Sequence, residues 1–162
     1  MITCTFENGN VASPGLRHVT VGAIVVKDGQ VLMGLRAPVK GLTMLETGKW
    51  ALLGGFFGFG ENLEAAVKRE VMEESGWEIA NLRLFRINDN PGRPKEDRQN
   101  MDMVFVADAV RQVGSSDAEV SQLQWFPLDA LPDSEQIAFD HGEDLALYID
   151  HLHTQRTLPI LG

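Results

Sequence analysis

Residues 54–77 read GGFFGFGENLEAAVKREVMEESGW, and the predicted fold is organised around this stretch. Four glycines fall within its first seven positions, which argues against a helix there and favours a loop. Residues 62–75 contain no Gly or Pro and are rich in Glu, Ala, Leu, Lys and Arg, so they are predicted to form a helix. Gly76 follows where a left-handed residue commonly ends a helix. The stretch therefore predicts a loop followed by a helix with a defined end.

Three glutamates of this predicted helix lie on one face. Glu70, Glu73 and Glu74 stand at i, i+3 and i+4, so their carboxylates gather and repel one another. Glu74 projects into the apolar stripe of the helix, and Glu70 lies at its edge. Two interpretations are open, a solvated charged face or a site for a hard divalent cation such as Mg²⁺, which takes carboxylate oxygens. Because the cluster adjoins the core, the cation site is favoured.

The same stretch resembles the signature of the Nudix hydrolases, G-x5-E-x7-R-E-U-x-E-E-x-G-U, in which U is a bulky apolar residue. The chain has every fixed position in register, namely Gly55, Glu61, Arg69, Glu70, Val71, Glu73, Glu74, Gly76 and Trp77. One departure is Gly58, where many relatives carry an acidic residue. More loosely, the chain resembles the ADP-ribose pyrophosphatase-like branch through GRPKEDRQN at 92–100, WFPLDALP at 125–132 and IAFDH at 137–141.

The resemblance implies an α/β fold, a Nudix-type α/β/α sandwich with a central mixed β-sheet and a loop–helix–loop catalytic motif. It implies that the three helix glutamates hold Mg²⁺ or Mn²⁺, with the backbone carbonyl of Gly54 as a further ligand. Arg69 would hold the carboxylates in place, and Glu61 would anchor the loop or act as an outer ligand. The implied activity is hydrolysis of the pyrophosphate of a nucleoside diphosphate linked to another moiety, with ADP-ribose or a nucleoside diphosphate sugar favoured.

Residues outside the signature complete the predicted site. Glu119 lies in a polar loop, where relatives often carry a carboxylate, and is the candidate general base; Glu70 or hydroxide on the metal is the alternative. Arg36 ends a predicted strand and would face either a phosphate or solvent. Arg93 and Arg98 belong to a long polar segment, 89–100, and would either clamp the diphosphate or pair with neighbouring acidic residues.

The rest of the chain is predicted to form a sheet and a second helix. Apolar, β-branched segments predict strands at 19–27, 31–36, 49–53, 78–88, 101–109 and 122–126. Asp140 and Glu143 are predicted to form a capping box for a helix whose apolar stripe comprises Leu145, Tyr148, Ile149 and Leu152. The histidines at 141, 151 and 153 lack the spacing of a metal site, and the chain is expected to fray beyond residue 154.

Length and charge narrow the class of protein. A chain of 162 residues is expected to be a single domain, 1–162. Its net charge of −9 and the absence of a basic stripe argue against nucleic-acid binding. The single cysteine, Cys4, cannot form an internal disulfide, and no segment resembles a membrane span or a signal peptide. The expected partner is a small-molecule nucleotide, without nucleic acid or membrane, in the cytoplasm; a homodimer is left open.

Three alternatives to this hydrolase are considered. A Nudix-fold nucleotide-binding or sensing domain without turnover typically has an eroded signature and an added DNA-binding domain, whereas the signature here is intact and no segment is left for such a domain. An isomerase of the isopentenyl diphosphate type needs a catalytic cysteine deep in the domain, and the only cysteine is Cys4. A nucleoside triphosphate pyrophosphohydrolase differs only in its substrate and stays open.

Overall fold

The computed structural model describes residues 17–38, 45–92 and 99–162. Its strands are β1 (Arg17–Lys27), β2 (Gln30–Arg36), β3 (Trp50–Ala51), β4 (Leu53–Phe56), β5 (Trp77–Asn88), β6 (Gln99–Gln112), β7 (Val120–Pro127) and β8 (Ile160–Leu161). The helices are α1 (Leu63–Ser75), the short 3₁₀ helix η1 (Ser134–Gln136) and α2 (His141–Thr154). Within these described ranges, no helix is both long and apolar enough to cross a membrane.

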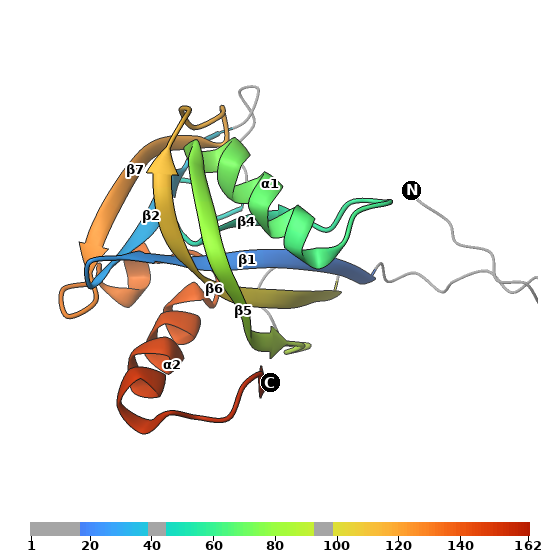
Figure 1. Ribbon diagram of the computed structural model, residues 1–162, viewed down its shortest axis with the longest axis vertical. Helices are drawn as coiled ribbons and strands as arrows, with labels where there is room; N and C mark the ends of the chain where they lie inside the picture. Colours follow the sequence, from blue (N-terminus) through green and yellow to red (C-terminus); the bar gives the residue numbers. More distant parts are fainter. Residues whose placement is uncertain (1–16, 39–44, 93–98) are drawn as a thin grey trace, which may run out of the picture.

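The strands form one mixed sheet between two helices. Its main order is β3-β2-β1-β6-β5-β8, while β4 pairs with β1 and β7 pairs with β2. The pairs β1–β6 and β5–β8 are parallel, and the other pairs are antiparallel. Figure 1 shows α1 and α2 on opposite sides of the sheet. The predicted α/β/α sandwich with a central mixed sheet is therefore confirmed.

Alternate residues of β1 face the two helices, as the two-residue period of a strand requires. Val21 and Ala23 belong to the apolar cluster that contains Val67 of α1. Ile24 belongs to the cluster on the other face, which contains Leu145 of α2. All five side chains are buried. The central strand is thus apolar on both faces because a helix covers each of them.

The sheet splits along one edge of β1. The end of β1 pairs with β2, from Val25↔Leu32 to Lys27↔Gln30, whereas its earlier part pairs with β4, from Thr20↔Phe56 to Ala23↔Leu53. β3 pairs with β2 instead, so the chain crosses from β2 to β1 at Leu52, the residue between β3 and β4. The diverging strands leave an opening beside this crossing, and the candidate site lies there.

Two predictions about local structure near the site need correction. The single strand predicted at 49–53 is two strands, β3 and β4, because the chain changes partner at Leu52. β4 also includes Gly54 and Gly55, for which the glycine content predicts a loop. These glycines lie in extended, paired backbone opposite Gly22 and Val21.

Predictions for the C-terminal part are also corrected. The Asp140 side chain forms no capping bond to α2; it accepts a hydrogen bond from Asn88 Nδ2 at 2.7 Å. The apolar stripe of α2 is shorter than predicted, since Leu152 is 51% exposed. The chain does not fray after residue 154 but forms β8, which pairs in parallel with β5 through Arg86↔Ile160.

Candidate functional site

Helix α1 carries the carboxylate cluster and has defined ends. The Asn62 side chain accepts a hydrogen bond from the backbone N–H of Ala65, which caps the first turn. Gly76 adopts the left-handed conformation with φ of 69°, and its N–H donates to the Met72 carbonyl. A Cβ at Gly76 would lie 2.2 Å from the backbone carbonyl carbon of Gly114, so a side chain has no room there. The predicted helix and its terminal glycine are confirmed.

Glu74 is the buried member of the cluster. Its side chain points into the core side of α1, and its Oε2 accepts a hydrogen bond from Gly54 N–H at 2.8 Å. Burial raises the pKa of Glu74 to about 8, the Gly54 N–H opposes this, and the charges of Glu70 and Asp117 raise it further. A carboxylate in this place needs a positive charge close by if it is to be ionised at neutral pH.

Arg69 connects the other carboxylates of the signature. Its Nη1 donates to Glu70 Oε1 at 2.7 Å and to Glu73 Oε2 at 3.1 Å. Its Nε and Nη2 donate to the two oxygens of Glu61 at 3.0 and 2.7 Å, and Nη2 also reaches the Phe56 carbonyl at 3.1 Å. One guanidinium thus joins the helix carboxylates to the loop before the helix.

The ionisation of these groups follows their surroundings. The hydrogen bond with Arg69 lowers the pKa of Glu61, and a backbone N–H from Gly58 lowers it further. Glu70 is half-buried, and burial raises its pKa despite the bond with Arg69; the charges of Glu73 and Glu119 raise it as well. The cluster therefore has more negative charge than Arg69 alone compensates.

Glu119 reaches this cluster from the loop between β6 and β7. The Asp117 N–H donates to the Glu73 carbonyl at 2.9 Å, which ties the loop to the end of α1. The Glu119 N–H donates to Asp117 Oδ1 at 2.8 Å, and its carbonyl accepts from Ala37 N–H at 2.8 Å. The backbone of Glu119 is thus held by Ala37 on one side and, through Asp117, by the end of α1 on the other.

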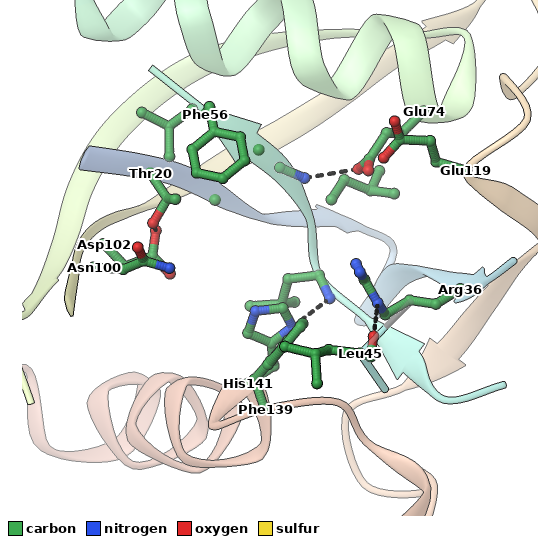
Figure 2. Close-up of a pocket in the computed structure, with 16 residues that line it drawn as sticks. Thr20, Arg36, Leu45, Phe56, Glu74, Asn100, Asp102, Glu119, Phe139 and His141 are labelled. Atoms are coloured by element: carbon green, nitrogen blue, oxygen red, sulfur yellow. Dashed lines mark hydrogen bonds between the residues drawn. The ribbon is translucent and has the colours of Figure 1, made fainter. Parts of the chain in front are cut away.

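A cavity of about 270 Å³ lies in the split of the sheet. Glu74 and Glu119 form its acidic wall, and Figure 2 shows their carboxylates side by side. Arg36, Phe139 and His141 line another side, which we call the donor wall. The remaining lining comes from β1, β4, β6, the segment between β2 and β3, and the residue between β3 and β4: Thr20, Val21, Gly22, Leu45, Leu52, Leu53, Gly54, Gly55, Phe56, Asn100 and Asp102.

The donor wall is held by its own contacts. Arg36 Nε donates to the Leu45 carbonyl at 3.2 Å, and the Arg36 guanidinium carbon lies 5.0 Å from the centre of the Phe139 ring. The Phe139 and His141 ring centres are 5.5 Å apart. The charge of Arg36 lowers the pKa of Glu74, opposing the effect of burial, so the two walls interact across the cavity.

The structure brings together most of the residues selected from the sequence. Arg36 and Glu119 line the same cavity as Glu74, and Gly54 donates to Glu74 directly. Arg93 and Arg98 lie outside the described residues, as does Cys4.

Sequence reasoning missed several lining residues. Asp102 lies at the far end of the cavity and accepts a hydrogen bond from Thr20 Oγ1 at 3.0 Å. An acidic residue near the start of the otherwise mostly apolar segment MDMVFVADA, 101–109, is a usable signal for it. His141 also lines the cavity, although the sequence suggests only a metal-binding role for it and argues against that role by its spacing.

The donor set suits a hard divalent cation by its chemistry. Glu70, Glu73 and Glu74 offer carboxylate oxygens, and their mutual repulsion is relieved by added positive charge. Within ranges 17–38, 45–92 and 99–162, however, no three His, Cys, Asp or Glu side chains converge as a metal site as they stand. Glu70 and Glu73 bond to Arg69 instead, so binding an ion requires their carboxylates to reorient.

Comparison with known proteins gives a family and a fold. The NUDIX domain model matches residues 16–147. The chain is 37% identical over 89 residues to an NAD-capped RNA hydrolase NudC of Vibrio atlanticus (strain LGP32), covering 54% of this chain but only 31% of that protein. It is 30% identical over 133 residues to an ADP-ribose pyrophosphatase of Methanocaldococcus jannaschii, covering 81% and 72% of the two chains. A NUDIX hydrolase structure from Nitrosomonas europaea matches with a TM-score of 0.77 at 22% identity, covering 99% and 92%.

Proposed function

This chain belongs to the NUDIX domain family, and on that premise we propose that it is a divalent-metal-dependent pyrophosphohydrolase. Its substrate is a nucleoside diphosphate linked to another moiety, with ADP-ribose or a nucleoside diphosphate sugar favoured. The similarity to an ADP-ribose pyrophosphatase over 133 residues supports this substrate class. The similarity to NAD-capped RNA hydrolases spans about a third of their length, so it supports the family more than their particular substrate.

The observation that carries the proposal is the pairing of two unlike walls around one cavity. The acidic wall and the neighbouring Glu70 and Glu73 supply ligands for a cation, while Arg36 on the donor wall supplies a fixed positive charge. A diphosphate carries negative charge on its phosphate oxygens, so positive charge on either side of it favours binding. Arg36 provides positive charge on one side of the cavity, and the carboxylates on the other side can bind a cation that provides more.

Glu70, Glu73, Glu74 and the Gly54 carbonyl would hold Mg²⁺ or Mn²⁺. When bound, such an ion supplies positive charge that neutralises and orients the phosphate oxygens. Arg69 positions Glu70 and Glu73 and ties them to the preceding loop through Glu61.

Glu119 is proposed to take the proton from the attacking water. It lines the cavity beside Glu74, and two backbone hydrogen bonds fix its position. Arg36 binds the diphosphate: its Nε is occupied by the Leu45 carbonyl, and the guanidinium is held against Phe139. These contacts reduce the conformational freedom that Arg36 would lose on binding.

A substrate panel with product identification tests the proposal. ADP-ribose, a UDP-sugar, NADH and nucleoside triphosphates are incubated with Mg²⁺ or Mn²⁺, and the products are separated by chromatography. We expect ADP-ribose to give AMP and ribose 5-phosphate with the highest kcat/KM. Glu74→Gln should remove this turnover, whereas Glu64→Gln, on the exposed side of α1 where Glu64 pairs with Lys68, should not.

Other outcomes of the panel identify the alternatives. A preference for a triphosphate would assign a nucleoside triphosphate pyrophosphohydrolase. Tight binding of ADP-ribose without turnover under any metal would assign a sensing domain. The cytoplasmic location, the single domain and the lack of nucleic-acid binding remain predictions, and a homodimer stays open.

A further inference from the structure

His141, the first residue of α2, accepts a hydrogen bond from the protein backbone. The Leu52 N–H donates to His141 Nδ1 at 3.0 Å. Because an N–H can only donate, Nδ1 must present its lone pair, and the proton of the neutral imidazole is then on Nε2. Flipping the ring would place a C–H against the Leu52 N–H, and Leu52 is only 5% exposed, so the flip would leave a buried donor without an acceptor. The backbone thereby selects one tautomer.

The helix terminus favours the same state. His141 lies at the N-terminus of α2, where the positive end of the helix dipole disfavours a positive side chain. The ring lines the cavity, and Figure 2 shows the edge opposite the Leu52 contact turned into it. His141 therefore presents a neutral N–H donor to the cavity.

The Nε2–H donor of His141 lies beside Arg36, the residue to which the proposed function assigns binding of the diphosphate. Phe139 lies between the two side chains, with its ring centre 5.5 Å from that of His141 and 5.0 Å from the Arg36 guanidinium carbon. Phosphate oxygens only accept hydrogen bonds, so they are complementary to the donor wall and repelled by the acidic wall. A diphosphate between the walls thus has two donors on one side.

We propose that His141 is a substrate-binding residue that donates its Nε2–H to an oxygen of the diphosphate, in a tautomer fixed by the Leu52 backbone. The inference rests on the proposed function, since it names a second contact for the same diphosphate. It also explains why Leu52, at the crossing between β3 and β4, is bonded to a side chain rather than to a strand. The cavity lies beside the crossing at Leu52, and the N–H of Leu52 also fixes the orientation of the His141 ring.

Two substitutions separate the contact with the backbone from the contact with the substrate. In His141→Asn the amide oxygen can take the place of Nδ1 and accept from Leu52, but nothing replaces Nε2. In His141→Gln the amide nitrogen can reach the place of Nε2, but no atom takes the place of Nδ1 as acceptor for the Leu52 N–H. His153→Asn, an exposed change in the last turn of α2, is the control.

We expect the loss of the His141 contact to raise KM much more than it lowers kcat. His141→Asn should keep the wild-type Tm and raise the KM for ADP-ribose roughly tenfold to hundredfold, as for the loss of a hydrogen bond to a charged group. Its kcat should change much less, the pattern of lost uniform binding. His141→Gln should have a KM nearer to wild type and a lower Tm. A wild-type KM in His141→Asn, with its Tm intact, would overturn the proposal.

A second readout does not need turnover. Long-range ¹H–¹⁵N NMR spectra of the wild-type ring should show Nε2 protonated and Nδ1 unprotonated. Adding α,β-methylene-ADP with Mg²⁺ should move the Nε2–H resonance downfield. The opposite tautomer, or an Nε2–H resonance that does not respond to saturating α,β-methylene-ADP, would overturn the inference. Failure of hydrolysis across the substrate panel would instead overturn the proposed function and leave these spectra to decide the role of His141.

Discussion

Replacing Glu74 with Gln should make the metal-free protein more stable at alkaline pH while abolishing its activity. Glu74 is 7% exposed, and its carboxylate accepts only a backbone N–H among the contacts described, that of Gly54 at 2.8 Å. Gln has nearly the same shape, and its amide oxygen can accept the same hydrogen bond. The substitution therefore removes a buried, ionisable group and leaves the packing of α1 against β4 in place.

The magnitude follows from the raised pKa. Burial moves the pKa of Glu74 from its ordinary value of 4.5 to about 8 in the folded protein. Between these values the folded state keeps a proton that the unfolded chain releases, so the free energy of unfolding falls by about 1.4 kcal/mol per pH unit. The stabilisation is complete below pH 4.5 and is lost as the pH rises through 8. The upper limit of the loss is about 5 kcal/mol, and the Gln variant does not suffer it.

Urea unfolding in EDTA at about pH 5 and about pH 9 measures this difference. We expect wild type and Glu74→Gln to be similar at the lower pH, and the variant to be more stable by several kcal/mol at the higher pH. Glu64→Gln, exposed on the same helix, should follow wild type at both values. Mg²⁺ should stabilise wild type and not Glu74→Gln, since only a ligand of the folded state shifts the equilibrium. An equal difference at both pH values, or equal stabilisation by Mg²⁺, would refute the reasoning.

Three further substitutions test other parts of the site and fold. Glu119→Gln should lower kcat by roughly 10²–10⁴ with little change in KM and remove the acidic limb of the pH–rate profile; a loss of less than a few-fold in kcat would return the role to the helix glutamates. Arg36→Ala should raise the KM for diphosphate substrates roughly tenfold or more, and an unchanged KM would place the arginine outside the substrate contacts. Arg86→Met should destabilise the protein by about 3–5 kcal/mol in urea unfolding, because it leaves buried Asp144 without its bond of 2.7 Å to Arg86. Adding Asp144→Leu should restore most of that stability, and failure to do so would show that the ion pair is not the cause.

The parts of the site that could be predicted from the sequence depend on contacts within one helix. The burial of Glu74 followed from its place in the 3.6-residue period with Val67 and Val71, which needs no knowledge of the partner element. The ends of α1 followed from Asn62 and Gly76, whose preferences act within a few residues. The fold class followed from the resemblance of the signature to a known family, and the apolar segment 19–27 predicted a strand buried on both faces.

Apart from Arg36, a candidate from its place at a strand end, the donor wall could not be predicted in this way, because its members come from distant segments. Leu52 and His141 are 89 positions apart and meet only when α2 packs beneath the crossing between β3 and β4. β8 is two residues long and carries no pattern of its own; its place depends on β5 being available as a neighbour. A strand this short is stabilised by its partner rather than by its own sequence.

The two glycines that begin the stretch 54–77 show how a correct reading of composition can lead to a wrong local structure. The glycine content predicts a loop at Gly54 and Gly55, yet they lie in β4, where a Cβ at either residue would meet occupied space. At residue 54 it would lie 2.1 Å from the Val21 carbonyl oxygen, and at residue 55 it would lie 2.6 Å from Glu70 Oε2. The glycines are therefore required for two close approaches, of β4 to β1 and of the carboxylates of α1 to β4. Since Gly54 also donates its N–H to Glu74, the absence of side chains at residues 54 and 55 allows α1 to place its glutamates against the backbone of β4 at the edge of the cavity.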